Sequence, residues 1–334
     1  MAPIETPGTA GVIAVTGATG FIGGVLVRAL RARGWTVRAL VRRDHPALAA
    51  AGVETLRGSL TDPGSLRALA AGADAVVHAA GATTAPSGRA FLAVNAAGTA
   101  RMASAADSAG CRRFLLISSL AAREPQLSAY AASKRAGEQA LARLALRLDT
   151  AIVRPPAVYG PGDRMTLPFF RQLARPRPLI PGRADARFSL LYVDDLAALI
   201  VRLLERPTWR GALVEPDDGE PGGYDWPRVA AIAAAYFGHQ SRPRFLPKAL
   251  LRLPAIASQA AARLFGFAPV LTPGKLAELY HPDWICRSDD DATDWRPAVR
   301  LDEGLARTWR WYAEAGWVVA DGRGHPLTQS SSML

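Results

Sequence analysis

Short apolar runs alternate with longer amphipathic segments through the first half of the chain, and each short run is almost continuously apolar. Such runs are typical of strands in a parallel sheet that is covered on both faces, and the segments between them have the length of helices. The pattern predicts an α/β fold with a doubly wound parallel sheet. The predicted strands are 11–16, 36–41, 54–58, 75–78, 114–118 and 151–154, and the predicted helices are 21–33, 63–71, 88–109 and 128–148.

The alternation of predicted strands and helices ends after Tyr159, where prolines become frequent and interrupt regular structure. A strand and a helix return within 189–205, and the mixed region that follows ends in an aromatic stretch at 309–317. We therefore predict a sheet domain at 1–160, completed by about 188–215, and a smaller, mostly C-terminal lobe at 161–187 and 216–326. Residues 327–334 are expected to form a flexible tail.

Composition narrows the class of protein without identifying it. A chain of 334 residues with 49% hydrophobic residues can bury a large core, which excludes a disordered or fibrous protein. The net charge of +11 is compatible with binding to nucleic acid, to membrane headgroups or to small anions, and does not choose among them. Because the arginines are scattered and no basic helix or aromatic RNA-binding signature accompanies them, we predict no nucleic-acid partner.

Cysteine usage and hydropathy indicate the compartment. Cys111 and Cys286 form no Cys-x-x-Cys pair, so neither a disulfide framework nor a metal site is expected, and a reducing cytoplasm fits. Residues 1–10 do not have the form of a secretory signal. No apolar run reaches the length of a membrane span; the nearest, 250–267, is interrupted by polar residues and a proline. Peripheral contact with a membrane stays open.

A glycine-rich turn joins the first predicted strand to the first predicted helix. Gly17 permits the tight turn, Gly20 lets the backbone approach a pyrophosphate, and Gly23 allows the helix to pack closely on the strand. The free N–H groups of the helix that begins near Phe21 attract an anion. The sheet domain is therefore predicted to be a Rossmann fold that binds a dinucleotide, and the lobe to bind substrate.

The end of the second predicted strand selects between NAD(H) and NADP(H). An acidic residue there binds the 2′-hydroxyl of NAD, whereas an arginine pairs with the 2′-phosphate of NADP. Val41 stands at the position where the acidic residue is expected, and Arg42 follows it. NADP(H) is therefore favoured, and NAD(H) stays possible. The alternatives are that Arg42 and Arg43 are merely solvated, or that Asp44 takes the acidic role.

Tyr130 and Lys134 are four residues apart, which places them on one face of the predicted helix. A phenol has an unperturbed pKa of about 10, but a neighbouring ammonium and a cationic nicotinamide ring both favour the phenolate. Tyr130 is therefore a candidate acid/base for a reaction that moves a hydride. Ser119, after a buried strand, is expected to orient the substrate oxygen; Ser118 is the alternative.

With these motifs the sequence resembles an extended short-chain dehydrogenase/reductase of the NAD-dependent epimerase/dehydratase family. It also resembles the dihydroflavonol reductase and 3β-hydroxysteroid dehydrogenase branch of that family. The resemblance covers nearly the whole chain. The matching segments are 16–23, 77–81, 94–99, 118–119, 130–134, 154–163 and 192–197.

The resemblance implies further cofactor contacts. Lys134 would bond the nicotinamide ribose, Pro155 would begin the segment that meets the carboxamide, and Ser59 stands where the family usually has an adenine-facing aspartate. A homodimer is common in the family. The complete set of expected cofactor-binding residues is Gly17, Thr19, Gly20, Phe21, Ile22, Arg42, Ser59, Leu60, Ala79, Ala80, Gly81, Tyr130, Lys134 and Pro155.

The substrate is indicated only by class. The loop from Ser119 to Tyr130 spans 11 positions, which is short for wrapping a nucleotide diphosphate. The apolar segment around 246–267 resembles the substrate lobe of the steroid and flavonoid branch, although ordinary helix core explains it nearly as well. We predict an NADP(H)-dependent oxidoreductase that interconverts a secondary alcohol and a ketone on a small lipophilic molecule. The alternatives are an NAD-dependent sugar-nucleotide epimerase/dehydratase and a non-catalytic protein that senses NAD(P).

Overall fold

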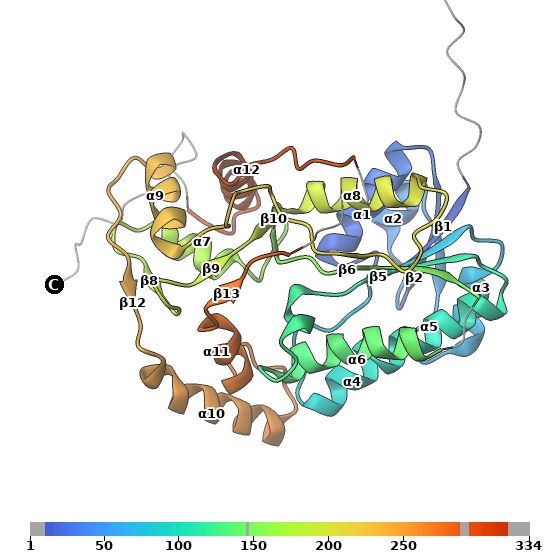
Figure 1. Ribbon diagram of the computed structural model, residues 1–334, viewed down its shortest axis with the longest axis horizontal. Helices are drawn as coiled ribbons and strands as arrows, with labels where there is room; N and C mark the ends of the chain where they lie inside the picture. The colour runs from blue at the N-terminus through green and yellow to red at the C-terminus, as the bar shows by residue number, and fades with distance from the viewer. Residues whose placement is uncertain (1–10, 145–146, 288–293, 320–334) are drawn as a thin grey trace, which may run out of the picture.

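The computed structural model describes residues 11–144, 147–287 and 294–319, so the predicted tail at 327–334 lies outside the described residues. Within them a seven-stranded, wholly parallel sheet has the order β11-β6-β5-β4-β1-β2-β3 (Figure 1). This confirms the predicted doubly wound sheet. The strands are β1 (Val12–Thr16), β2 (Thr36–Val41), β3 (Glu54–Arg57), β4 (Ala75–His78), β5 (Arg113–Ile117), β6 (Asp149–Val153) and β11 (Leu213–Val214).

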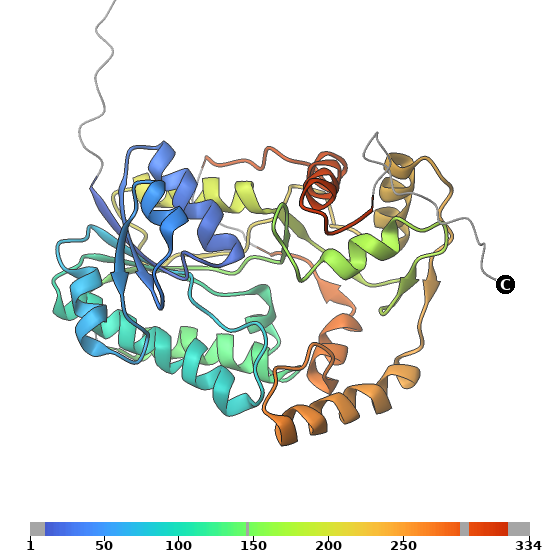
Figure 2. The ribbon, with the colours of Figure 1, turned by 180° about the vertical axis from the view of Figure 1, so that it is seen from behind.

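Helices cover both faces of the sheet, because successive strand residues point to opposite sides. Ile13 and Val15 pack under α1 and α8, whereas Ala14 belongs to the core beneath the helices of the other face. Figure 2 shows the same two layers from behind. The helices of this domain are α1 (Phe21–Ala32), α2 (Pro46–Ala50), α3 (Pro63–Ala70), α4 (Gly88–Asn95), α5 (Ala97–Ser108), α6 (Ala129–Arg143) and α8 (Val193–Glu205).

The structure corrects one predicted helix and adds another. The segment 88–109 is two helices that meet at Ala96, which is the C-cap of α4 and the N-cap of α5. The Thr99 hydroxyl donates to the carbonyl of Asn95 at 2.7 Å, a bond that bends helices, and the Asn95 side chain is held by Ala82 and Ser133. The added helix, α2, is a short turn begun by proline.

The second half of the chain builds a lobe beside the carboxyl ends of the strands (Figure 1). Its core gathers aromatic side chains, among them Tyr159, Phe170, Trp309 and Tyr312. The lobe helices are α7 (Leu167–Leu173), α9 (Trp226–Phe237), α10 (Lys248–Phe265), α11 (Pro273–Leu279) and α12 (Leu301–Glu314). The short strands form the parallel pairs β7 (Ala157–Tyr159) with β10 (Leu190–Tyr192), β8 (Leu179–Ile180) with β12 (Arg244–Phe245), and β9 (Arg187–Phe188) with β13 (Asp283–Trp284).

The chain returns to the sheet between these lobe segments. Helix α8 packs on α1, and β11 extends the sheet by pairing with β6. On these contacts we propose the division into a sheet domain and a lobe. None of the helices in the described ranges is long and apolar enough to cross a membrane.

Two neighbouring glycines of α1 give a direct test of helix-on-strand packing. A Cβ added at Gly23 would lie 2.0 Å from the Gly17 carbonyl oxygen, whereas one at Gly24 would make an ordinary contact of 3.7 Å with the Ala18 oxygen. We expect Gly23→Ala to lower the free energy of unfolding by about 1–3 kcal/mol. Gly24→Ala should raise it by up to about 1 kcal/mol, since alanine is the better helix former. Urea unfolding measures both, and equal effects would contradict this packing.

Candidate active site

The glycine turn after β1 has the shape of an anion cradle. Gly17 has φ +76°, and a Cβ there would lie 2.6 Å from the backbone nitrogen of Ala80. Gly20 is the N-cap of α1 and offers no side-chain acceptor to the first N–H groups of that helix. Unsatisfied N–H groups at a helix start, with backbone open above them, suit a pyrophosphate. The residues present therefore fit a dinucleotide.

Ser119, Tyr130 and Lys134 come together at the carboxyl end of β5. Helix α6 begins after Ser128, whose Oγ accepts a hydrogen bond from the Ala131 nitrogen at 2.9 Å, so Tyr130 lies in the first turn. The Ser119 side chain lines the same cavity and is close enough to lower the pKa of this hydroxyl. One turn later, the Lys134 Nζ donates to the Ile117 carbonyl at 2.8 Å. The two elements thus place a phenol, a hydroxyl and an ammonium around one space.

Burial determines the protonation of these groups in the chain alone. Burial raises the pKa of Tyr130 to about 12; the hydrogen bond with Ser119 opposes this rise, and the charge of Glu278 adds to it. Burial also lowers the pKa of Lys134 to about 8, and the negative charge of Glu138 opposes this by raising it. The expected influence of a cationic nicotinamide ring on Tyr130 belongs to the cofactor-bound state and stays a prediction. Without that ring, burial raises the pKa of Tyr130, which favours the protonated phenol.

A buried ion cluster lies behind the three residues. Arg154 donates to both carboxylate oxygens of Glu138, at 2.8 and 2.6 Å, and to Glu215 at 3.2 Å. The hydroxyl of Ser118 donates to Glu138 at 2.5 Å. Ser118, the alternative to Ser119, is therefore engaged by this cluster, whereas the Ser119 side chain is the one that influences the pKa of Tyr130.

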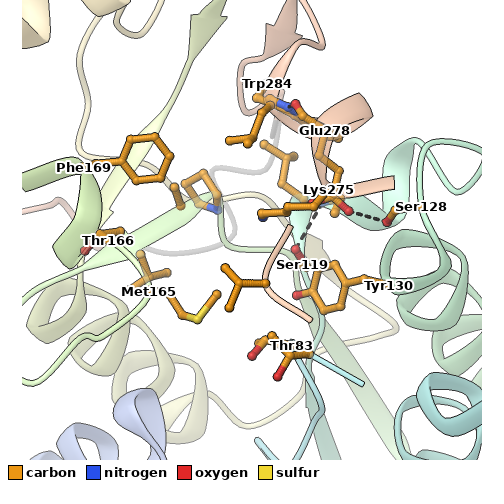
Figure 3. Close-up of a pocket in the computed structure, with 18 of the residues that line it drawn as sticks. Thr83, Ser119, Ser128, Tyr130, Met165, Thr166, Phe169, Lys275, Glu278 and Trp284 are labelled. Atoms are coloured by element: carbon orange, nitrogen blue, oxygen red, sulfur yellow. Dashed lines mark hydrogen bonds and ion pairs between the residues drawn. The ribbon is translucent and has the colours of Figure 1, made fainter. Parts of the chain in front are cut away.

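A cavity of ≈ 520 Å³ opens in front of Tyr130 and Ser119. Figure 3 shows Met165 and Phe169 across the cavity from these two side chains, so the sheet domain supplies one wall and the lobe the other. Most of the remaining lining is apolar or aromatic, including Phe91, Phe188, Trp226, Trp284 and Leu279.

One polar pair from α11 reaches this cavity beside Tyr130. Glu278 is buried, accepts a hydrogen bond from the Ser128 hydroxyl, and pairs with Lys275 at 3.1 Å. Both residues line the cavity (Figure 3). The contact joins the lobe to the N-cap of α6, the helix that carries Tyr130.

The other expected cofactor contacts lie around the same sheet edge. Phe21, Ile22 and Pro155 line the cavity, and a Cβ at Gly81 would lie 3.6 Å from the Nζ of Lys134. Thr19 and Gly20 are exposed at the turn, while Ala79 and Ala80 follow β4 directly against it.

The two groups expected at the adenosine end are also at the surface. Arg42 is exposed after β2 and makes no hydrogen bond or ion pair with any described residue. Ser59 follows β3, and its hydroxyl is hydrogen-bonded to that of Thr61 at 2.8 Å, with Leu60 between them.

Sequence reasoning missed Glu138 and the pair Lys275 and Glu278. A signal for Glu138 was present, because it continues the spacing of four from Tyr130 and Lys134 along one helix face. Glu278 is the one acidic residue between Asp225 and Asp283 in the sequence. This makes it unusual, but it does not show which residue Glu278 contacts. Among residues with described positions, no group of three or more His, Cys, Asp or Glu could hold a metal ion.

Comparisons with known proteins agree with this geometry. Residues 13–211 match the model of the NAD dependent epimerase/dehydratase family. The chain is 42% identical to a ceramide reductase of Caulobacter vibrioides, over 92% of this chain and 96% of that one. It is 32% identical to a 2-alkyl-3-oxoalkanoate reductase of Stenotrophomonas maltophilia, over 55% and 62%. The solved structure of MoeE5 with UDP-glucuronic acid and NAD has a TM-score of 0.69 at 22% identity, covering 92% of this chain and all of that one.

The buried cluster should be essential to stability. Arg154→Met leaves Glu138 and Glu215 as buried carboxylates without their cation, and we expect it to lower the free energy of unfolding by about 3–5 kcal/mol. Arg183→Met is the matched control, because Arg183 pairs with Asp185 at 2.6 Å on the exposed surface. The control should be unchanged, since exposed pairs contribute little. Urea unfolding compares them, and equal stabilities would show that the buried cluster is not needed.

Proposed function

Because the chain belongs to the NAD dependent epimerase/dehydratase family and is an NAD(P)-dependent enzyme of the short-chain dehydrogenase/reductase type, we propose that it reduces a ketone on a lipophilic substrate. The observation that carries the proposal is the apolar cavity in front of Tyr130 and Ser119. The identity with a ceramide reductase over nearly the full length of both chains supports the same class of substrate.

The lining of the cavity favours a lipid over a nucleotide sugar. No arginine of the described chain lines it, and its one lysine, Lys275, is already paired with Glu278. The lining offers a second nucleotide diphosphate neither an arginine fork nor a free lysine, the side chains that commonly bind phosphates. Aromatic and aliphatic walls with a few convergent polar groups are instead what an apolar ligand needs.

The chemistry assigned to the chain is proton donation and orientation. A bound nicotinamide cofactor supplies the hydride. The protonated Tyr130 hydroxyl gives its proton to the carbonyl oxygen as that oxygen gains charge, and Ser119 holds the same oxygen by a hydrogen bond. The product is a secondary alcohol, and Tyr130 recovers its proton from solvent. Lys134, beside Gly81 and Ile117, is proposed to hold the nicotinamide ribose.

NADP(H) is proposed as the cofactor. Arg42 follows β2 at the position that meets the adenosine ribose in this fold. Its guanidinium forms no ion pair with a carboxylate of the described chain. Its charge is therefore available for a 2′-phosphate, to which arginine binds in a bidentate manner.

A turnover assay tests the reaction and the substrate class together. We expect the protein to oxidise NADPH with a ketone that carries a long alkyl chain, and to leave UDP-glucose and UDP-glucuronic acid unchanged. Tyr130→Phe should lower kcat by about 10²–10⁴-fold, because it removes the general acid. NADPH binding should persist in the variant.

Tyr236→Phe is the control for this assay, since it makes the same chemical change in α9, outside the cavity lining. It should retain the wild-type rate. Three results would overturn the proposal: turnover of a UDP-sugar without net NADPH oxidation, an unchanged rate in Tyr130→Phe, or cofactor binding without turnover of any ketone.

Cofactor choice is tested separately by fluorescence titration with NADPH and NADH. Arg42→Ala should weaken NADPH binding about 10–100-fold, the value of one or two charge-assisted hydrogen bonds, and leave NADH binding unchanged. Arg28→Ala removes an exposed arginine from α1 as a control for net charge. Tighter NADH than NADPH binding in the wild type would refute the NADP(H) assignment.

A further inference from the structure

Helix α10 presents an apolar stripe that nothing in the described chain covers. Leu250, Leu253 and Leu264 are 65%, 77% and 77% exposed. At 100° per residue these side chains, with Ile256, fall on one face of the helix, opposite the fully buried Ala255 and Ala262. The apolar exposure continues beyond the helix through Phe265, Phe267 and Val270. Of the twelve large hydrophobic side chains that are exposed among the described residues, seven are thus gathered within 250–270.

The same segment carries only positive charge. Arg252 and Arg263 are exposed and lie along one border of the stripe, and Lys248 is exposed at the first residue of the helix; none of the three forms an ion pair with a described carboxylate. Across 240–277 the sequence has basic residues and no acidic one. An apolar stripe with a basic border is the pattern of a helix that lies in a membrane interface, where headgroups meet acyl chains.

The position of α10 in the molecule suits a flat partner. Figures 1 and 2 both show α10 at the outer edge of the lobe, on the side away from α9 and α12 and with α11 next to it. The exposed apolar segment that follows the helix reaches the cavity through Val270. Gln259 of α10, then Pro269 and Val270 after it, line the cavity, and Val270 is 70% exposed.

We propose that α10 and the segment that follows it, through Val270, form a docking surface for a lipid bilayer with anionic headgroups. The helix lies along the interface with its leucines and Phe265 among the acyl chains, and Lys248, Arg252 and Arg263 meet the headgroups. Docking in this orientation places the Val270 side of the cavity against the membrane. The surface is independent of the reaction proposed above.

Vesicle flotation of the full chain tests the surface. Wild type should float with phosphatidylcholine vesicles that contain about a third phosphatidylglycerol, and about tenfold less with phosphatidylcholine alone, since each basic residue near an anionic surface adds attraction. High salt should weaken flotation on the anionic vesicles.

The double variant Leu253→Gln, Phe265→Gln should reduce flotation by about tenfold or more, because two large side chains leave the acyl region. Both residues are largely exposed, so the fold should survive, which thermal unfolding checks. Val319→Gln is the matched control: Val319 is 69% exposed and follows α12, which Figure 1 shows on the side of the lobe away from α10, and its variant should float like wild type.

Three outcomes would overturn the proposal. These are no flotation on anionic vesicles, equal flotation of the double variant and wild type, and a concentration-dependent dimer that the double variant abolishes while vesicles are not bound. The last would assign the stripe to a second copy of the chain. Failure of the reductase proposal is distinguishable, because flotation needs no turnover and a detergent-dispersed ketone can be reduced without vesicles.

Discussion

Arg154 lies between two buried carboxylates, and the site is built around this contact. Glu138 belongs to α6, which carries Tyr130 and Lys134, and Glu215 follows β11 at the edge of the sheet. Arg123 extends the cluster to the lobe by contacting Glu215 at 3.6 Å and donating to the Asp283 and Ile285 carbonyls. Buried charges are tolerated only when they are fully paired, so helix, sheet and lobe are held in one relative arrangement.

In this arrangement burial sets the pKa of both Tyr130 and Lys134. An enclosed phenol and an enclosed ammonium both move toward their neutral forms, which raises the pKa of Tyr130 and lowers that of Lys134. A protonated phenol beside a second hydroxyl suits the gain of a proton by a carbonyl oxygen, the step that a reduction requires. The enclosure itself comes from the lobe, where Glu278 of α11 contacts Ser128 at the start of α6.

The features of the fold and the site that depend on local sequence patterns could be predicted from the sequence. The observed bounds of β2 and β4 equal the predicted ones, and the proximity of Ser119 to Tyr130 follows from a strand end meeting the next helix start. It missed what depends on distant contacts: Glu278 meets Ser128 across 150 positions. The explanation of 246–267 as ordinary helix core was wrong for Leu253, which is 77% exposed, because a hydrophobic pattern does not show whether a partner covers it.

If the substrate is a lipid ketone, the apolar cavity and the apolar stripe serve the same need, which is to keep the acyl chain of the substrate out of water. Each methylene that leaves a bilayer for water costs about 0.8 kcal/mol, so a long acyl chain cannot cross open solvent at a useful rate. A cavity that opens beside an interfacial helix removes this barrier, because the chain passes from one apolar medium into another. Val270 belongs to both surfaces, as an exposed residue and as part of the cavity lining. Access to the site would then depend on where the protein lies as much as on which groups surround Tyr130.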